Sequence, residues 1–226
     1  MIKNLYLTLT RIKVGRFSSL LISLFLLFTL RPFMEGLISI RLLMDVFITF
    51  ILISGIYAAS EKKEVLIISL AFALPAFAGS WSLLFMENSF LKVMTKVSFA
   101  LFFVYTAIIL IFYLFKAKDV TSDIIVGAIC AFFLIGLMWA NIFEILHFFH
   151  PNAFHFSQGE SIDANSFIYY SFVTLTTLGY GDITPLISSA KSLSVLEAAT
   201  GQIYLTVVLA RLVGIHIAQS VDGKSP

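Results

Sequence analysis

Long apolar stretches dominate the sequence, and only short polar breaks separate most of them. Only the first is too short for the roughly 20 apolar residues that a helix needs to cross about 30 Å of hydrocarbon. Leu, Ile and Phe dominate this first stretch, so it still counts as a span. The pattern predicts an all-α membrane protein with six transmembrane helices. The stretches are residues 17–30, 37–59, 65–85, 97–115, 124–146 and 192–220.

The composition supports a lipid environment and argues against several other functions. Of the 226 residues, 59% are hydrophobic and only 12% are charged, whereas charged residues make up about 25% of an average soluble domain. The net charge is only +2 and no long basic run is present, so nucleic acid is not an expected partner. The sequence has no glycine-rich phosphate loop and no nucleophile motif, so we expect neither enzymatic activity nor an organic cofactor.

Lysine and arginine in the short loops predict the orientation of the chain. With six spans and a cytoplasmic N-terminus, these residues are about twice as frequent inside as outside. Both termini are then cytoplasmic, and the segment 147–191 is outside. Only a few residues follow the last span, so no cytoplasmic ligand-binding domain is expected. The compact chain suggests the inner membrane of a prokaryotic cell.

The segment between the fifth and sixth spans is unusual. Residues 166–176 are apolar, but a helix of about 11 residues extends only about 16 Å and cannot cross the membrane. Such a re-entrant segment is tolerated only where protein or a water-filled cavity surrounds it. We therefore expect the chain to build a cavity here, most simply by assembling with further copies of itself.

Directly after this short helix the sequence runs Thr-Leu-Gly-Tyr-Gly-Asp, from Thr177 to Asp182. This run resembles the signature of pore-loop potassium channels, Thr-Val/Ile-Gly-Tyr-Gly-Asp. The resemblance covers the pore region from about Gly127 to Gly214, and the first four spans match only in number and length. It implies a homotetramer surrounded by lipid, in which each chain has three identical subunits as partners. It also implies that K⁺ is the permeant ion and binds at Thr177, Leu178, Gly179 and Tyr180.

The chemistry of the motif follows from dehydration, because an ion inside the membrane needs oxygens that replace its water. Carbonyls that all point inward require alternating backbone twists, some with φ above zero, which Gly179 and Gly181 adopt at little cost. Leu178 departs from the usual valine or isoleucine, but its carbonyl rather than its side chain would meet the ion. One chain cannot close a ring around an ion, so four copies are implied.

The resemblance divides the chain into three parts. They are a cytoplasmic N-terminal segment (1–16), a peripheral unit of four helices (17–116) and a pore unit (124–220). The fourth span lacks lysine and arginine, so intrinsic voltage gating is not expected. Within the pore unit we predict an outer helix (124–146), a turret (147–165), a pore helix (166–176), a filter (177–182) and an inner helix (192–220).

Several residues around the filter are candidates for its support. The end of the pore helix at Thr176 carries partial negative charge, which favours a cation nearby. The resemblance implies that Tyr169 and Tyr170 pack behind the filter, although aromatic residues are common at any membrane interface. Asp182 either adds negative potential at the outer mouth or is a solvated turn residue. Glu144, near the end of the fifth span, is expected to brace the pore loop.

Two residues of the last span are further candidates. Gly201 lies where related channels often have a gating hinge, but close helix packing explains a glycine equally well. Glu197 is ionisable and lies within the membrane, where such residues tend to be functional. It either lines the cavity or bonds to the pore helix of a neighbouring subunit, and we favour the bond. The role of three histidines after the fifth span stays open: His147, His150 and His155.

Passive, potassium-selective conduction is the function that these features favour. One alternative is a weakly selective cation channel, but such relatives tend to lose the tyrosine of Gly-Tyr-Gly. Another is a potassium-binding transporter subunit, but such chains usually contain several pore loops, and this sequence has one.

Overall fold

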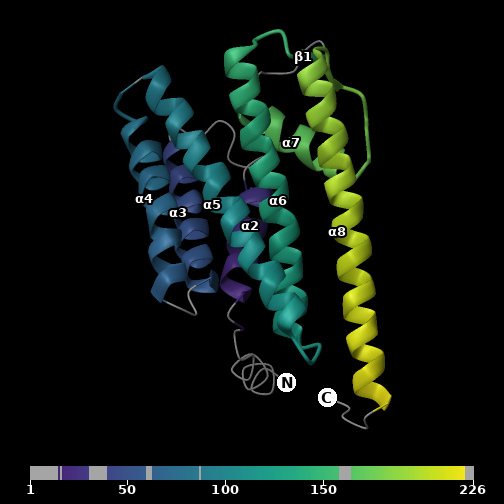
Figure 1. Cartoon of the computed structure of the whole chain (residues 1–226). Helices are drawn as coiled ribbons and strands as arrows, with labels where there is room; N and C mark the ends of the chain where they lie inside the picture. The colour runs from purple at the N-terminus through teal and green to yellow at the C-terminus, as the bar shows by residue number, and fades with distance from the viewer. Residues whose placement is uncertain are drawn as a thin grey trace, which may run out of the picture.

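The computed structural model describes residues 15, 17–30, 40–59, 63–86, 88–157 and 164–221. Apart from Gly15, the predicted N-terminal segment 1–16 lies outside these residues. The described chain is mostly helical (Figure 1). Its helices are α2 (Ser18–Leu30), α3 (Ile40–Ala59), α4 (Lys63–Ser82), α5 (Ser89–Lys116), α6 (Ser122–Phe149), α7 (Ala164–Leu175) and α8 (Ser188–Val221), and its strands are β1 (Phe154–Phe156) and β2 (Ile183–Pro185).

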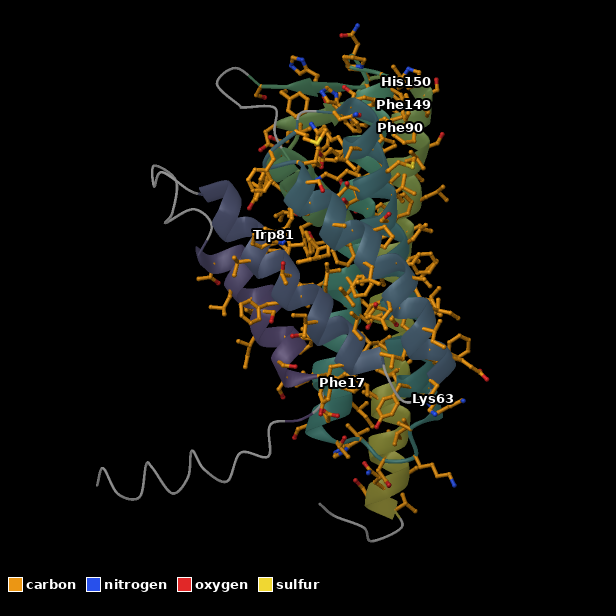
Figure 2. All side chains as sticks on the ribbon, turned by 90° about the vertical axis from the view of Figure 1, so that its left-hand side faces the viewer. Phe17, Lys63, Trp81, Phe90, Phe149 and His150 are labelled. Atoms are coloured by element: carbon orange, nitrogen blue, oxygen red, sulfur yellow. The ribbon has the colours of Figure 1, made fainter. Side chains whose placement is uncertain are left out.

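Four of the described helices, α4, α5, α6 and α8, are long and apolar enough to cross a membrane. Consecutive helices run up and down beside one another, and α8 returns alongside α6 (Figure 1). Phe90, Phe149 and His150 accordingly lie at one end of the molecule, and Phe17 and Lys63 lie towards the other (Figure 2). The chain is thus a helical membrane protein, as predicted. The described parts of α2 and α3 are shorter apolar segments, so the count of six spans remains a prediction.

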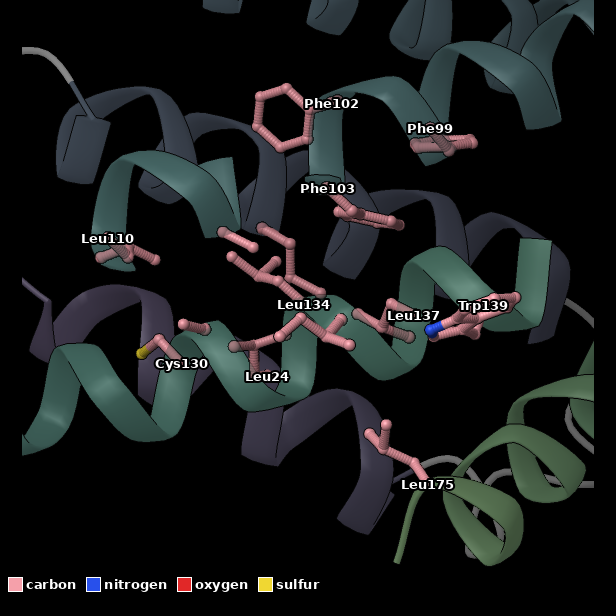
Figure 3. Close-up of a cluster of buried hydrophobic side chains, with 14 of the residues drawn as sticks. Leu24, Phe99, Phe102, Phe103, Leu110, Cys130, Leu134, Leu137, Trp139 and Leu175 are labelled. Carbon is pink, nitrogen blue, oxygen red and sulfur yellow. The ribbon is translucent and has the colours of Figure 1, made fainter. Parts of the chain in front are cut away.

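Helix α5 joins the peripheral helices to the predicted pore unit, because it packs against both α4 and α6. Phe102 and Phe103 of α5 belong to the same buried cluster as Leu134 and Leu137 of α6 (Figure 3). All four side chains are almost completely buried. Burying such side chains between helices fixes the position of α6, the outer helix of the predicted pore unit.

Helix α2 also supports the pore unit. Its Phe28 ring meets Phe133 of α6 and Phe172 of α7, with ring centroids 5.3 and 4.8 Å apart. Both contacts are edge-to-face, an arrangement that aromatic rings prefer. The short helix α7 is therefore packed against protein on the side that faces α2 and α6.

At their predicted outer ends, helices α5, α6 and α8 extend beyond the apolar runs in the sequence. Helix α5 begins at Ser89 instead of residue 97, because the Asn88 side chain caps it by accepting two backbone N–H groups at 2.9 and 3.2 Å. The added turns are amphipathic and include Lys96, so they do not belong to the continuous apolar run from which the span was predicted. Helix α6 likewise extends to Phe149, and α8 already begins at Ser188.

Helix α7 lies between α6 and α8 near one end of the molecule (Figure 1). At 12 residues it is too short to cross a membrane, and its bounds are close to those of the predicted pore helix.

The predicted turret contains a strand that the sequence did not reveal. Strand β1 pairs antiparallel with β2, with Phe154 opposite Pro185 and Phe156 opposite Ile183. Because β1 precedes α7 and β2 follows the filter, this small sheet ties together the two ends of the pore loop.

Candidate functional site

The candidate filter begins as the C-terminal cap of α7. The N–H of Thr177 donates to the carbonyl of Thr174 at 2.9 Å. The N–H of Leu178 donates to the carbonyl of Val173, also at 2.9 Å. This pair of bonds is a Schellman motif, which ends a helix with one residue in the left-handed conformation. That residue is Thr177, with φ of 58°. The helix therefore ends where the filter sequence starts, because the filter backbone satisfies the last carbonyls of α7.

The sign of φ alternates along the filter. It is positive at Thr177, Gly179 and Gly181, with values of 58°, 60° and 83°, and at no other described residue. The positive φ at Gly179 and Gly181 agrees with the backbone twist predicted from the sequence for these two glycines. Thr177 is β-branched, so its conformation is rare. Such conformations cost roughly 1–3 kcal/mol each and persist mainly at functional sites.

The filter residues lie open in the single chain. The side chains of Leu178 and Tyr180 are 56% and 67% exposed. A Cβ atom built on Gly179 or Gly181 would meet nothing within 4 Å. In a single chain, these filter residues thus face open space.

Asp182, directly after the filter, is held by several neighbours. The Tyr169 hydroxyl donates to Oδ2, and the backbone N–H of Ile183 donates to Oδ1 at 3.1 Å. The N–H and hydroxyl of Ser157 both donate to the Asp182 carbonyl at 3.0 Å. The Tyr169 ring also stacks on Tyr180, with centroids 6.4 Å apart and an interplanar angle of 8°. Tyr169 therefore links α7 to both the filter and its outer end.

Tyr170 makes a different set of contacts from Tyr169. Its hydroxyl lies 2.6 Å from the Ser194 hydroxyl of α8, and its ring meets Phe143 and Phe154 edge-on. Neighbouring helical residues point about 100° apart, which separates the two tyrosines. Within the single chain, Tyr169 contacts the filter and Tyr170 joins α7 to α6 and α8, so the predicted role of Tyr170 behind the filter stays a prediction. Thr176 has its own local contact, because its hydroxyl donates to the Phe172 carbonyl at 2.6 Å.

Glu197 of α8 is fully buried, with 0% of its surface exposed. Its Oε1 lies 2.5 Å from the hydroxyl oxygen of Ser171 on α7. The same hydroxyl oxygen lies 2.7 Å from the carbonyl of Gly136 on α6. Glu197 thus contacts a pore helix, as favoured from the sequence, but within its own chain and not that of a neighbour.

Gly201 lies one turn further along α8 and also faces α7. A Cβ atom at this position would stand 2.0 Å from the backbone oxygen of Leu175. The packing explanation for this glycine therefore has a direct structural basis, and the hinge remains a prediction. The next residue, Gln202, is exposed, and its Nε2 donates to the Thr177 hydroxyl at 3.4 Å. These contacts fix the rotation of α8, which periodicity in the sequence could not.

Glu144 forms an ion pair with Lys96 of α5, with 2.7 Å between Oε2 and Nζ. This contact connects the outer helix of the pore unit to the peripheral helices. The described residues provide no contact between Glu144 and the pore loop, so its support of the filter stays a prediction.

The three histidines do not gather into a site. The His147 ring packs against Phe154, Phe156 and Phe167, at centroid distances of 5.2 to 6.5 Å. His155 lies on β1 opposite Thr184 of β2. In the described parts of the chain, no three His, Cys, Asp or Glu side chains are arranged to hold a metal ion.

A short helix that ends in a loop of alternating handedness, between two long apolar helices, is the arrangement of a pore-loop ion channel. Residues 131–216 match the family model described as "Ion channel". Over 64 residues the chain is 38% identical to the protein named two-pore potassium channel 4 of Arabidopsis thaliana. The pore region of this chain is thus similar to an ion channel family model and to part of a protein named as a potassium channel.

The extent of these matches is limited. The aligned segment covers 27% of this chain and 22% of the Arabidopsis protein, so the chain spans about a fifth of the length of that relative. No solved structure matches the chain. These similarities thus concern the pore region, and the activity of the whole protein is a matter of proposal.

Proposed function

We propose that this chain is one subunit of a potassium-selective channel that conducts K⁺ passively across the membrane. The backbone carbonyls of residues 177–180 and the Thr177 hydroxyl would replace the hydration water of the ion. Gly181 would be the last residue of the segment in which the sign of φ alternates. The single observation that carries this proposal is the alternation of φ at residues 177, 179 and 181.

Four copies of the chain would close the conduit. Leu178 and Tyr180 are apolar or aromatic residues that a single chain leaves open, and large apolar patches commonly mark interfaces. Helix α8 also exposes many large apolar side chains over its length. A homotetramer would cover part of this surface with neighbouring subunits and leave the rest to lipid.

The residues around the filter have separate parts in this proposal. Thr176 would direct the negative end of α7 towards the ion path. Tyr169 would hold Asp182 at the outer mouth, where its charge attracts cations, and Tyr170 would fix α7 to α8. Gly201 would allow α8 to approach α7 closely.

The proposed orientation places both termini in the cytoplasm of a prokaryotic cell and the filter towards the outer side of its inner membrane. The basis is the distribution of lysine and arginine in the short loops. The expected function excludes enzymatic activity, and K⁺ is the transported ion.

Ion flux into liposomes tests the proposal. Purified protein should pass K⁺ at least about tenfold faster than Na⁺, a difference of about 1.4 kcal/mol, and Ba²⁺ should block the K⁺ flux. Gly179→Ala should abolish selective flux, because an L-residue in the left-handed region costs about 1–2 kcal/mol. Within a single chain, a Cβ atom at this position would meet nothing within 4 Å, so no contact inside the subunit accounts for the loss.

Gly214→Ala is the matched control for Gly179→Ala. Gly214 lies within α8, has no positive φ and would also place its Cβ in open space. Selective flux should survive this change. Equal fluxes of K⁺ and Na⁺ through the unmodified protein would instead indicate a weakly selective cation channel. Uptake that saturates and depends on a second solute would indicate a transporter subunit.

A further inference from the structure

The Ser171 hydroxyl connects three helices of the pore unit. Its oxygen lies 2.7 Å from the Gly136 carbonyl on α6 and 2.5 Å from Glu197 Oε1 on α8, while Ser171 itself belongs to α7. Ser171 and Glu197 both have 0% of their surface exposed, so water does not compete for these contacts. The Ser171 and Glu197 side chains of the bridge are therefore shielded from water.

A count of protons determines the direction of the two bonds. A serine hydroxyl donates one hydrogen bond and accepts up to two. The Gly136 carbonyl can only accept, and an ionised Glu197 could also only accept, so one of the two short contacts would then contain no proton. Both contacts are hydrogen bonds only if Glu197 is protonated and donates to Ser171, which in turn donates to the Gly136 carbonyl.

The surroundings of Glu197 favour the same neutral form. Among the described residues, no cationic side chain pairs with it, and its second oxygen has no hydrogen-bond partner. An isolated carboxylate buried in this way is very costly, and such groups neutralise instead. Glu144 has the opposite situation, because Lys96 neutralises its charge at 2.7 Å.

The bridge lies between two close approaches of the helices. A Cβ atom on Gly136 would stand 2.6 Å from the Phe172 ring, and one on Gly201 would stand 2.0 Å from the Leu175 backbone oxygen. Glu197 thus lies between two places where small residues bring α6 and α8 against α7. A hydrogen bond at this point limits both the rotation and the tilt of α7.

We propose that Glu197 is a protonated positioning residue, which donates through Ser171 to lock the pore helix between the outer and inner helices. Because the filter starts as the C-terminal cap of α7, the bridge sets the position of the filter carbonyls. Glu197 does not touch the ion and does not attract it by charge. This inference rests on the proposed channel function and assigns the carboxyl a role within it.

Substitution of Glu197 separates hydrogen bonding from charge. In Glu197→Gln, an amide N–H can take the place of the acid proton, so the K⁺/Na⁺ flux ratio should remain within about twofold of the original. Glu197→Ala and Ser171→Ala both remove the bridge, and each should lower the ratio by about fivefold or more. If Gln is as damaging as Ala, the negative charge is what matters and the proposal is wrong.

Infrared spectroscopy tests the protonation state without any flux. The carbonyl stretch of a protonated carboxylic acid should be present in the purified protein and should be lost in Glu197→Gln. Glu144→Gln is the control and should remove no such band, because Lys96 pairs with this carboxylate at 2.7 Å. Absence of a protonated-acid band assigned to Glu197 would overturn the proposal.

The two readouts also separate this proposal from the channel function. If the unmodified protein conducts no K⁺ but the acid band is present and disappears in Glu197→Gln, the channel function fails and the protonated bridge stands. If Glu197→Ala does not fold, the comparison of Glu197→Gln with Ser171→Ala still decides the positioning role.

Discussion

Gly201 of α8 lies so close to Leu175 of α7 that a Cβ atom on the glycine would stand 2.0 Å from the leucine backbone oxygen. A backbone atom cannot rotate away, so Gly201→Ala must push the two helices apart. Overpacking of this kind costs about 1–3 kcal/mol, which exceeds or matches the gain of about 1 kcal/mol from replacing a helical glycine. We expect a lower midpoint of thermal unfolding in detergent and a reduced K⁺/Na⁺ flux ratio.

Gly214→Ala provides the comparison on the same helix, because its Cβ would enter open space. This variant should unfold at the same temperature as the original or a slightly higher one. A Gly201→Ala protein of unchanged stability but altered open probability would contradict the packing role and favour the hinge.

The Tyr169 hydroxyl should stabilise the outer mouth through Asp182. Tyr169→Phe keeps the ring that stacks on Tyr180 but removes the donor to the carboxylate. Hydrogen bonds to charged groups contribute about 1.5–3 kcal/mol. We therefore expect at least about a tenfold increase in the K⁺ concentration that protects the assembly against heat.

Tyr105→Phe is the matched control for Tyr169→Phe. Tyr105 of α5 packs against Phe72 of α4 and has no hydrogen bond among the described residues. If the same K⁺ concentration protects both variants against heat, the Tyr169 hydroxyl is dispensable.

The position of the candidate filter could be predicted because it depends on local sequence. A helix too short to cross the membrane and two glycines spaced by one residue specify a re-entrant loop with alternating handedness. The structure adds that Thr177 is the first left-handed residue, which the cap of α7 explains. A β-branched residue would not be expected there from conformational preference alone.

Other features could not be predicted because they depend on residues distant in sequence. Strand β1 has only three residues, and nothing in that run identifies Ile183–Pro185 as its partner. The rotation of α8 follows from Gly201 and Glu197 fitting against α7, whereas α8 itself is apolar over most of its circumference. The ion pair of Glu144 could not be predicted either, because its partner Lys96 lies in an amphipathic turn outside the apolar run.

The Lys96–Glu144 ion pair should couple the peripheral helices to the pore unit. Both side chains are partly buried, at 23% and 14% exposure, so the pair is less screened than one at a free surface. A double-mutant cycle with Lys96→Ala and Glu144→Ala should give a coupling free energy of about 1 kcal/mol in unfolding experiments. Additive effects would show that the pair contributes nothing. A changed K⁺/Na⁺ flux ratio in Glu144→Ala alone would support its predicted role at the filter.

The charge distribution of α5 predicts that the membrane voltage does not open the channel. Between residues 97 and 115 this helix has no lysine or arginine, and its basic residues lie near its two ends. Each charge that crosses the field supplies about 2.3 kcal/mol per 100 mV, so a helix without central charges supplies almost none of this energy. Single-channel recordings in planar bilayers should show an open probability that changes little between negative and positive potentials.

Arg211 of α8 is the control position, because its guanidinium donates to the carbonyls of Phe115 and Ala117 at 3.1 and 3.2 Å. If open probability rises steeply with depolarisation and Arg211→Gln removes that dependence, the gating charge lies on the inner helix and the prediction from α5 is wrong.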